Sequence, residues 1–306
     1  MAGVDNEEMC GVICVNKPEG FTSFDVIAKM RGILKIKRLG HAGTLDPMAT
    51  GVLPVFVGRA TKACDILPDH DKIYRAGFKL GLTTDTQDCT GTVTQERDPS
   101  AVTENNLLDT LERFRGEIMQ IPPMYSAVSV NGKRLYDLAR QGIEVEREAR
   151  PVTIYRLELA EFDEAEKSGV LTVSCSKGTY IRTLINDIGE ALGCGGIMTS
   201  LVRTTACGFS LEDCVTIEDL QREAENERNF EQYLKPVEDV FAELPKLMLH
   251  GAQERMYRNG IKLDLTKIRT DITAERISVY GEKGFIGTAV PDRENGVLRV
   301  DKTFYL

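Results

Sequence analysis

The sequence lacks any apolar run long enough to cross a membrane as a helix. Such a helix needs about 18 consecutive apolar residues, whereas the longest apolar run covers residues 52–57 and contains Pro54. The first ten residues are acidic and show no basic segment followed by an apolar one, so we expect neither a signal peptide nor a transit peptide. We therefore predict a cytoplasmic protein that has no membrane partner.

Sequence patterns that bind metals and cofactors are missing as well. The eight cysteines form no CxxC pair, and none of the three histidines stands at metal-ligand spacing from a cysteine or another histidine. In a chain that is not exported, scattered cysteines indicate free thiols. Neither a GxGxxG fingerprint nor a P-loop occurs. We therefore expect no metal ion and no cofactor.

The net charge of −9 weighs at first against a nucleic-acid partner. The acidic residues are concentrated, however, because residues 211–243 hold eleven acids and only three bases. Residues 26–45 contain no acid at all and carry Lys29, Arg31, Lys35, Lys37 and Arg38. Charges further apart than about 8–10 Å are screened in physiological salt, so this basic strip can bind phosphates locally. The alternative is an ordinary solvated helix face.

The hydrophobic pattern predicts an α+β chain of mixed strand order rather than a regular alternation of strands and helices. We expect strands over residues 11–16, 52–57, 74–80, 152–162 and 170–175. Helices are expected from Thr22 or Ser23 to Leu34, over 107–115 and 180–192, with further acidic helical patterns in 215–243. The last sixty residues have short strands and glycine turns, typical of a small β-domain. No heptad seam is present, so we expect a monomer.

The densest group of candidate functional residues lies in residues 40–54, GHAGTLDPMATGVLP. Glycine lets a backbone approach a ligand closely, and Pro47 keeps Asp46 out of the helical region. A single carboxylate on such a loop, beside an acid-free basic strip, suits chemistry on an anionic polymer. The alternative is an Asx-turn, in which Asp46 only accepts backbone hydrogen bonds.

This segment also carries a resemblance to a known family. GHAGTLDPMATGVLPV (40–55) resembles the catalytic motif of the TruB family of tRNA pseudouridine synthases. Similar blocks follow the family's order along the chain, namely GVICVNKPEGFTSFDV (11–26), GRATKACD (58–65), KIYRAGFKLGLTTDTQDCTG (72–91), IPPMYSAVSVNGKRLYDLARQG (121–142) and CSKGTYIRTLINDIGEALGCGG (175–196).

The resemblance implies both a fold and an activity. It implies a pseudouridine synthase fold over residues 1–244, with a mixed, largely antiparallel central sheet flanked by helices and loops and an RNA-contacting insertion at about 121–151. Residues 245–306 resemble a PUA-type RNA-binding domain, the alternative being a β-domain that only shields the core. The implied activity isomerises uridine 55 in the T loop of tRNA to pseudouridine. The base flips out of its stack, the glycosidic bond is cleaved, and the rotated base is rejoined through C5.

The resemblance also assigns roles to residues. Asp46 is implied as the catalytic aspartate, Tyr74 as the residue that stacks on the target uracil, and Arg182 as the partner of the Asp46 carboxylate. The implied RNA- and substrate-binding residues are His41, which helps to hold the stem open, Leu201, which lines the apolar wall of the pocket, and Tyr180, Lys17 and Lys62. The basic strip adds Arg31, Lys35 and Lys37 as candidate phosphate-binding residues.

Physical chemistry supports these roles. Flipping a base costs a few kcal/mol, and stacking on an aromatic ring returns about 1–3 kcal/mol, which favours Tyr74. An arginine stays charged and can fix a carboxylate through two hydrogen bonds, which favours Arg182. Asp46 can attack C1′, stabilise it or take a proton from C2′, and the sequence leaves these paths open. Substrate and product contain the same atoms, so no redox or group-carrying cofactor is required.

Two other functions remain open at this point. Some positions that often carry polar or basic residues in the family hold Ser129, Ile197 and Val202 here, which reduces the expected contacts to RNA. The first alternative is therefore a tRNA-folding chaperone that needs no catalysis. The second is a carbohydrate hydrolase that uses Asp46 together with Asp85 or Asp88 as its second carboxylate.

Overall fold

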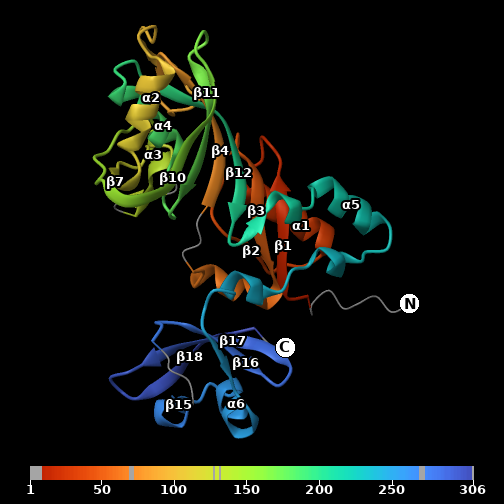
Figure 1. The fold of residues 1–306 in the computed structure, drawn as a ribbon. Helices are drawn as coiled ribbons and strands as arrows, with labels where there is room; N and C mark the ends of the chain where they lie inside the picture. The colour runs from red at the N-terminus through yellow and green to blue at the C-terminus, as the bar shows by residue number, and fades with distance from the viewer. Residues whose placement is uncertain (1–8, 69–71, 127, 131, 269–272, 305–306) are drawn as a thin grey trace. The chain divides into compact units, whose positions relative to one another are not determined.

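The computed structural model describes residues 9–68, 72–126, 128–130, 132–268 and 273–304 of the chain. The first eight residues, where no signal peptide is expected, and residues 127 and 131 of the predicted insertion lie outside the described residues. The described residues form two compact units, the first drawn from 1–46, 52–68 and 207–306 and the second from 47–51 and 69–206. The predicted α+β class with mixed strand order is confirmed (Figure 1).

The second unit is built on an antiparallel sheet. Its strands lie in the order β12 (Gly196–Ala206), β4 (Lys72–Leu80), β11 (Ser168–Cys175), β10 (Arg150–Asp163) and β7 (Gly116–Gln120). Helices α2 (Glu104–Glu112) and α4 (Ile181–Ala191) cover one face, where a small cavity is lined by residues of both helices and by Phe78, Leu80 and Leu171 of the sheet. Strand side chains alternate between faces, so Tyr74 of β4 points to the same face as Phe78.

Shorter elements complete this unit. They are the hairpin of β5 (Leu82–Thr84) and β6 (Val93–Glu96), the hairpin of β8 (Ser129–Val130) and β9 (Lys133–Arg134), and α3 (Leu135–Ala139). The helix predicted over 107–115 begins earlier, at Glu104, because Thr103 caps it through a hydrogen bond to the amide of Asn106. Strand β12 was not predicted.

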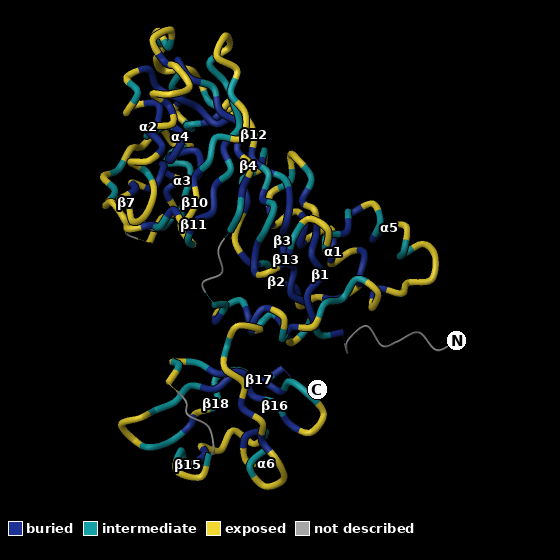
Figure 2. Tube along the Cα trace, viewed as in Figure 1, coloured by how far each residue is buried: buried dark blue, intermediate teal, exposed yellow. Residues whose placement is uncertain are grey.

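In the first unit, helices α1 (Ser23–Leu34) and α5 (Ile217–Glu225) bury apolar side chains against β1 (Gly11–Lys17) and β3 (Thr50–Val57). Figure 2 shows β1 and β3 almost entirely buried. The predicted start of α1 is confirmed: Thr22 caps it in a capping box with Asp25, and the hydrogen bonds from Thr22 lower the pKa of Asp25. Strand β2 (Leu39–His41) pairs with the second half of β3.

The acidic segment and the C-terminus finish the first unit. Helical patterns were expected in residues 215–243. The structure has only α5 and the short 3-10 turns η3 (Phe230–Tyr233) and η4 (Val237–Phe241) there. The turn η2 (Leu211–Asp213) and the strand β13 (Phe209–Ser210) precede them. The predicted C-terminal sheet is present, with strands in the order β14 (Lys246–Met248), β16 (Ile277–Gly281), β17 (Gly284–Asp292), β18 (Val297–Thr303) and β15 (Leu263–Asp264). Helix α6 (Gly251–Arg258) packs on it through the buried Tyr257, whose hydroxyl donates to the carbonyl of Thr288 at 2.8 Å.

Strand β3 runs from the second unit into the first. Its first two residues, Thr50 and Gly51, pair in parallel with Val202 and Arg203 of β12. Gly51 has φ +103°, and a Cβ placed on it would overlap the carbonyl oxygen of Arg203. Only glycine therefore fits at this contact.

We predict that Gly51→Ala lowers the free energy of unfolding by about 2 kcal/mol or more, because the new methyl group forces β3 away from β12 and strains the backbone. The matched control is Gly32→Ala on the exposed side of α1, where the added methyl group meets no atom within 4 Å. We expect this control to be stabilised by up to about 1 kcal/mol. Urea unfolding followed by circular dichroism measures both variants, and equal effects would contradict the assigned contact.

Candidate active site

Asp46 lies on the loop between β2 and β3, and this loop is held at both of its ends. On the first side, the buried hydroxyl of Ser23 accepts a hydrogen bond from the amide of Leu45 at 2.9 Å and donates to the carbonyl of Leu45 at 3.4 Å. The Leu45 side chain is buried as well. On the second side, Gly51 rests against the backbone of Arg203. The backbone immediately before Asp46 is therefore held by Ser23, independently of any ligand.

Strand β12, which pairs with Thr50 and Gly51 at the start of β3, also carries the residues opposite Tyr74. In the antiparallel pair of β12 and β4, Arg203 stands opposite Tyr74 and Leu201 opposite Ala76. Residues directly opposite each other share a face of the sheet, so Tyr74, Leu201 and Arg203 lie on the face that α4 covers. The structure thus gathers two of the predicted residues on one face. No sequence signal pointed to Arg203, which is completely buried and stands opposite Tyr74.

Arg182 lies in the first turn of α4 and is almost completely buried. Its Nη2 donates to the carbonyl of Tyr125 at 2.6 Å, and its Nη1 lies 3.7 Å from Oδ2 of Asp88. Asp88 is also buried, and its Oδ1 accepts hydrogen bonds from the hydroxyls of Thr86 and Thr90 and from the amide of Thr90. This arrangement holds a negative charge beside the guanidinium. It suits Asp88 to orienting Arg182 better than to the hydrolytic role considered above.

A second buried polar side chain fixes the start of α4. The amide of Gln120 donates to the carbonyl of Tyr180 at 3.1 Å, and its Oε1 accepts from the backbone amide of Tyr180 at 2.8 Å. Tyr180 is the N-cap residue of α4, two residues before Arg182. The sequence offered no signal for Gln120, whereas Asp88 stood among the candidate carboxylates without its partner being foreseen.

Comparisons with known proteins identify the family. Residues 31–181 match the family model described as TruB family pseudouridylate synthase, N-terminal domain, and residues 182–242 match that of the tRNA pseudouridylate synthase B C-terminal domain. The chain is 44% identical over 287 residues to the tRNA pseudouridine synthase B of Clostridium tetani, covering 94% of this chain and 97% of the relative. Its identity to the protein of that name from Clostridium perfringens strain 13 is 46% over 289 residues, covering 94% and 96%.

The chain belongs to the TruB family of pseudouridylate synthases.

Solved structures agree with this membership in the family. A Cbf5-Nop10-Gar1 complex matches with a TM-score of 0.74 at 28% identity, over 96% of this chain and 85% of the other. An H/ACA RNP bound to a substrate RNA containing 2′-deoxyuridine matches with a TM-score of 0.71 at 26% identity, over 97% and 85%. The predicted fold and family of this TruB-family chain are therefore confirmed.

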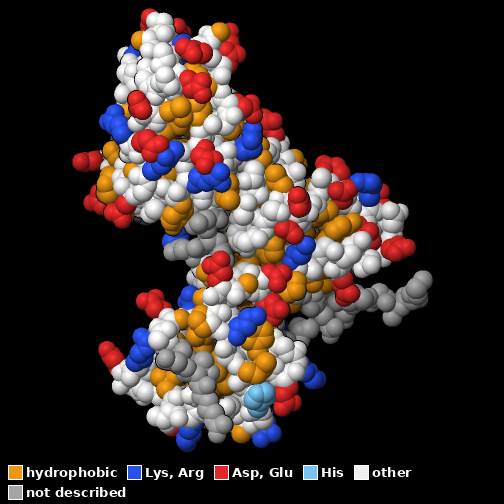
Figure 3. All heavy atoms as spheres, in the orientation of Figure 1, with side chains coloured by type: hydrophobic (Ala, Val, Ile, Leu, Met, Phe, Trp, Pro, Cys, Tyr) orange, Lys and Arg blue, Asp and Glu red, His pale blue; other side chains and the backbone are white. Residues whose placement is uncertain are grey.

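The basic strip of this TruB-family chain lies on the surface of the first unit. Lys29, Arg31, Lys35, Lys37 and Arg38 are all exposed at or just beyond the C-terminal half of α1. The Nε of Arg31 donates to the carbonyl of Lys37 at 3.1 Å, and its guanidinium lies 5.9 Å from the ring centre of the exposed Phe24. Elsewhere, on the face drawn in Figure 3, basic side chains lie among acidic ones.

Two of the predicted RNA-binding lysines make contacts within the protein. Lys17 is completely buried, and its Nζ donates to the carbonyls of Pro18 and Phe21, at 2.9 and 2.5 Å. The Nζ of Lys62, in η1 (Gly58–Asp65), donates to the carbonyl of Thr303 at 3.1 Å. His41 is half-buried on β2, opposite Val55 of β3. The RNA contacts of these three residues stay predictions.

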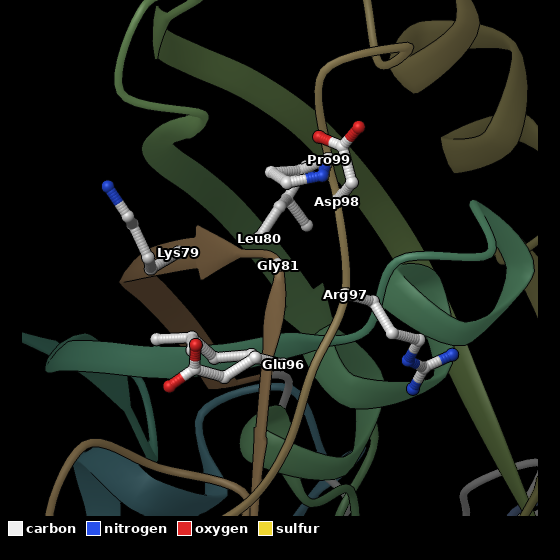
Figure 4. A pocket seen from close by; sticks show the side chains of 8 residues that line it. Lys79, Leu80, Gly81, Glu96, Arg97, Asp98 and Pro99 are labelled. Atoms are coloured by element: carbon white, nitrogen blue, oxygen red, sulfur yellow. The ribbon is translucent and has the colours of Figure 1, made fainter.

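An open cavity of the second unit lies at the far end of β4 from Tyr74. It measures about 440 Å³ and is lined by two short segments, residues 79–82 and 96–99. In Figure 4 the side chains of Lys79 and Arg97 point in different directions, and these cations pair with Glu166 and Glu190 respectively. This cavity therefore offers no common point for an anionic ligand.

Two features bear on membranes and metals. Among the described residues, no helix is both long and apolar enough to span a bilayer. The same part of the chain contains no group of three or more histidine, cysteine or acidic side chains arranged to hold a metal ion.

We predict that Asp88→Ala lowers the free energy of unfolding by about 2–3 kcal/mol, because the hydroxyls of Thr86 and Thr90 lose a charged buried acceptor and Arg182 loses the Asp88 carboxylate. The matched control is Asp85→Ala, since Asp85 is exposed and accepts a hydrogen bond from the amide of Thr92 at 2.8 Å. For this control we expect a loss of about 1 kcal/mol. Urea denaturation compares the two variants, and a loss for Asp88→Ala no larger than that of the control would show that the buried pair does not stabilise the fold.

Proposed function

We propose that this chain is a cytoplasmic, monomeric enzyme that converts uridine 55 in the T loop of tRNA to pseudouridine. The proposal is supported by membership in the TruB family and by relatives named tRNA pseudouridine synthase B. The observation that carries it is the double pairing of β12, which joins the end of the Asp46 loop through Gly51 and joins β4 opposite Tyr74. Thr50 and Gly51, which follow the Asp46 loop, are thereby held to the sheet that carries Tyr74.

Asp46 acts on the sugar of the flipped uridine as its glycosidic bond breaks. The reaction leaves an electron-poor centre at C1′, and a carboxylate acts there as nucleophile or electrostatic stabiliser, or as a base at C2′. The released uracil turns and forms its new bond to C1′ through C5. C5 then loses its proton to solvent and N1 takes up a proton, so the product contains the same atoms as the substrate. Fixed backbone on both sides of Asp46 suits this role, because the carboxylate needs no reorganisation when charge develops.

Tyr74 and Leu201 form the part of the site that receives the base. Once the uracil has left its stack, the ring of Tyr74 offers an aromatic face and Leu201 an apolar wall. Stacking then offsets the few kcal/mol that unstacking costs. The hydroxyl of Tyr74 is also suited to taking the proton from C5.

Arg182 keeps the catalytic carboxylate charged and oriented. Its pairing with Asp46 is inferred from the family resemblance. A guanidinium carries five N–H donors in a planar fork, so one arginine can serve more than one carboxylate. In this scheme Asp88 orients Arg182 from the other side.

Three surfaces are proposed to bind the RNA. The basic strip at the end of α1 meets phosphates of the T arm, and residues 121–151 form a further contact. Residues 245–306 act as a PUA-like RNA-binding domain. None of these surfaces takes part in the chemical step, so changes there are expected to alter affinity alone.

The proposed activity is tested by release of tritium from C5 of uridine in a T-arm stem-loop. We expect release by the wild type and none by Asp46→Asn, because an amide neither attacks C1′ nor accepts a proton as a carboxylate does. Asp85→Asn serves as a control for the loss of an exposed carboxylate and should react like the wild type. Filter binding measures whether Asp46→Asn still holds the RNA.

The outcomes separate the proposed function from its alternatives. Full activity of Asp46→Asn would refute the catalytic role of Asp46. Binding of RNA without tritium release by the wild type, together with growth rescue by Asp46→Asn in cells that lack the enzyme, would establish the chaperone function. Free uracil or free sugar among the products would establish a hydrolase.

The basic strip generates a salt-dependence prediction. Binding should weaken with salt, because each phosphate contact releases counterions. Replacing Arg31, Lys35 and Lys37 together by alanine should reduce the slope of log K against log salt by roughly one for each lost phosphate contact, without changing the chemical step at saturating RNA. The control is Arg222→Ala on α5, where the arginine is paired with Asp219. A slope that is the same in all three proteins would contradict phosphate binding by the strip.

A further inference from the structure

The hydroxyl of Ser23 is engaged with the loop that carries Asp46 rather than with its own helix. Ser23 is 1% exposed, and its Oγ makes hydrogen bonds to both backbone groups of Leu45, the residue before Asp46. These contacts link residues separated by 22 positions in the chain. We propose that Ser23 is a positioning residue that sets the placement of the Asp46 carboxylate. This inference rests on the catalytic role proposed for Asp46.

Helix capping does not account for the Ser23 hydroxyl. Serine is common at the first positions of helices because its side chain caps free backbone amides. Here Thr22 performs that task, since its hydroxyl accepts from the amide of Asp25 at 3.0 Å. The two adjacent hydroxyls therefore have different partners. That of Thr22 caps helix α1, whereas that of Ser23 bonds Leu45 in the loop before Asp46.

The two hydrogen bonds restrict the backbone immediately before the carboxylate. With its amide and its carbonyl both bonded to one buried oxygen, Leu45 is held against rotation, and its buried side chain adds a further constraint. Pro47 limits the backbone of Asp46 from the following side. Ser23 and Pro47 therefore restrain the backbone on either side of the Asp46 side chain.

A purely structural role for Ser23 makes a different prediction from a positioning role. If Ser23 only satisfies a buried amide, its loss lowers stability and leaves the reaction rate of the folded, RNA-bound enzyme unchanged. If it positions Asp46, its loss lowers that rate even when RNA is saturating, because a displacement of about 1 Å can slow a reaction about 100-fold. The rate at saturation is therefore the deciding measurement.

The experiment compares Ser23→Ala, Ser23→Cys and Thr22→Ala in the full-length protein. Tritium release from a T-arm stem-loop is followed under single-turnover conditions with enzyme in saturating excess, and the Kd for RNA and the urea midpoint are measured for each variant. For Ser23→Ala we expect a rate about 10- to 100-fold lower, with a Kd within about twofold of the wild type, since no RNA contact is removed. Ser23→Cys keeps a weak donor and acceptor, so its rate should lie between the two.

Thr22→Ala is the matched control. It should lower the urea midpoint because the helix loses its cap, while the rate at saturating RNA stays that of the wild type. A wild-type rate for Ser23→Ala would overturn the proposal. If Ser23→Ala fails to fold, Ser23→Cys decides, and a wild-type rate for that variant would overturn it equally. Failure of the proposed function is recognised separately, by tritium release from Asp46→Asn.

Discussion

The short parallel pairing between β3 and β12 is the constraint that ties the start of β3 to the central sheet of the second unit. It involves only Thr50 and Gly51 on one strand and Val202 and Arg203 on the other. Because β12 also pairs with β4, the same few residues connect the end of the Asp46 loop with the strand of Tyr74. The close backbone contact requires a residue without a Cβ, and Gly51 fulfils that requirement with a φ of +103°.

Both units use the same device to fix a residue close to a candidate catalytic group. Ser23 bonds both backbone groups of Leu45, next to Asp46, and Gln120 bonds both backbone groups of Tyr180, two residues before Arg182. A buried side chain that makes two hydrogen bonds to one residue holds that residue in a single conformation, and breaking either bond leaves a buried polar group unpaired. Catalytic side chains that act through electrostatics benefit from such rigid support.

The charges of this chain are unevenly distributed, with an acidic segment and a separate basic strip that contains no acid. The net charge of −9 is concentrated in residues 211–243, where α5 and the 3-10 turns carry most of it. The exposed strip at the end of α1 is free of acids from residue 26 to residue 45. Since screening limits the reach of exposed charges to about 8–10 Å, the phosphate binding proposed for the strip requires direct contact and does not depend on the total charge.

The sequence by itself determined the elements whose signals are local. A short apolar run predicted β1, and alternation of apolar residues predicted β4. The two strand-like segments around a polar turn predicted β10 and β11. The Thr22 cap predicted the start of α1, and the ordered blocks around Asp46, Tyr74 and Arg182 predicted the family. Only the tertiary structure revealed β12, because its segment GIMTSLVRTTA alternates poorly and its pairing with β4 contains two irregularities. Ser23, Asp88, Gln120 and Arg203 likewise gain their roles from partners distant in the chain. Local periodicity records which face of an element is buried, but it does not record which polar groups meet there.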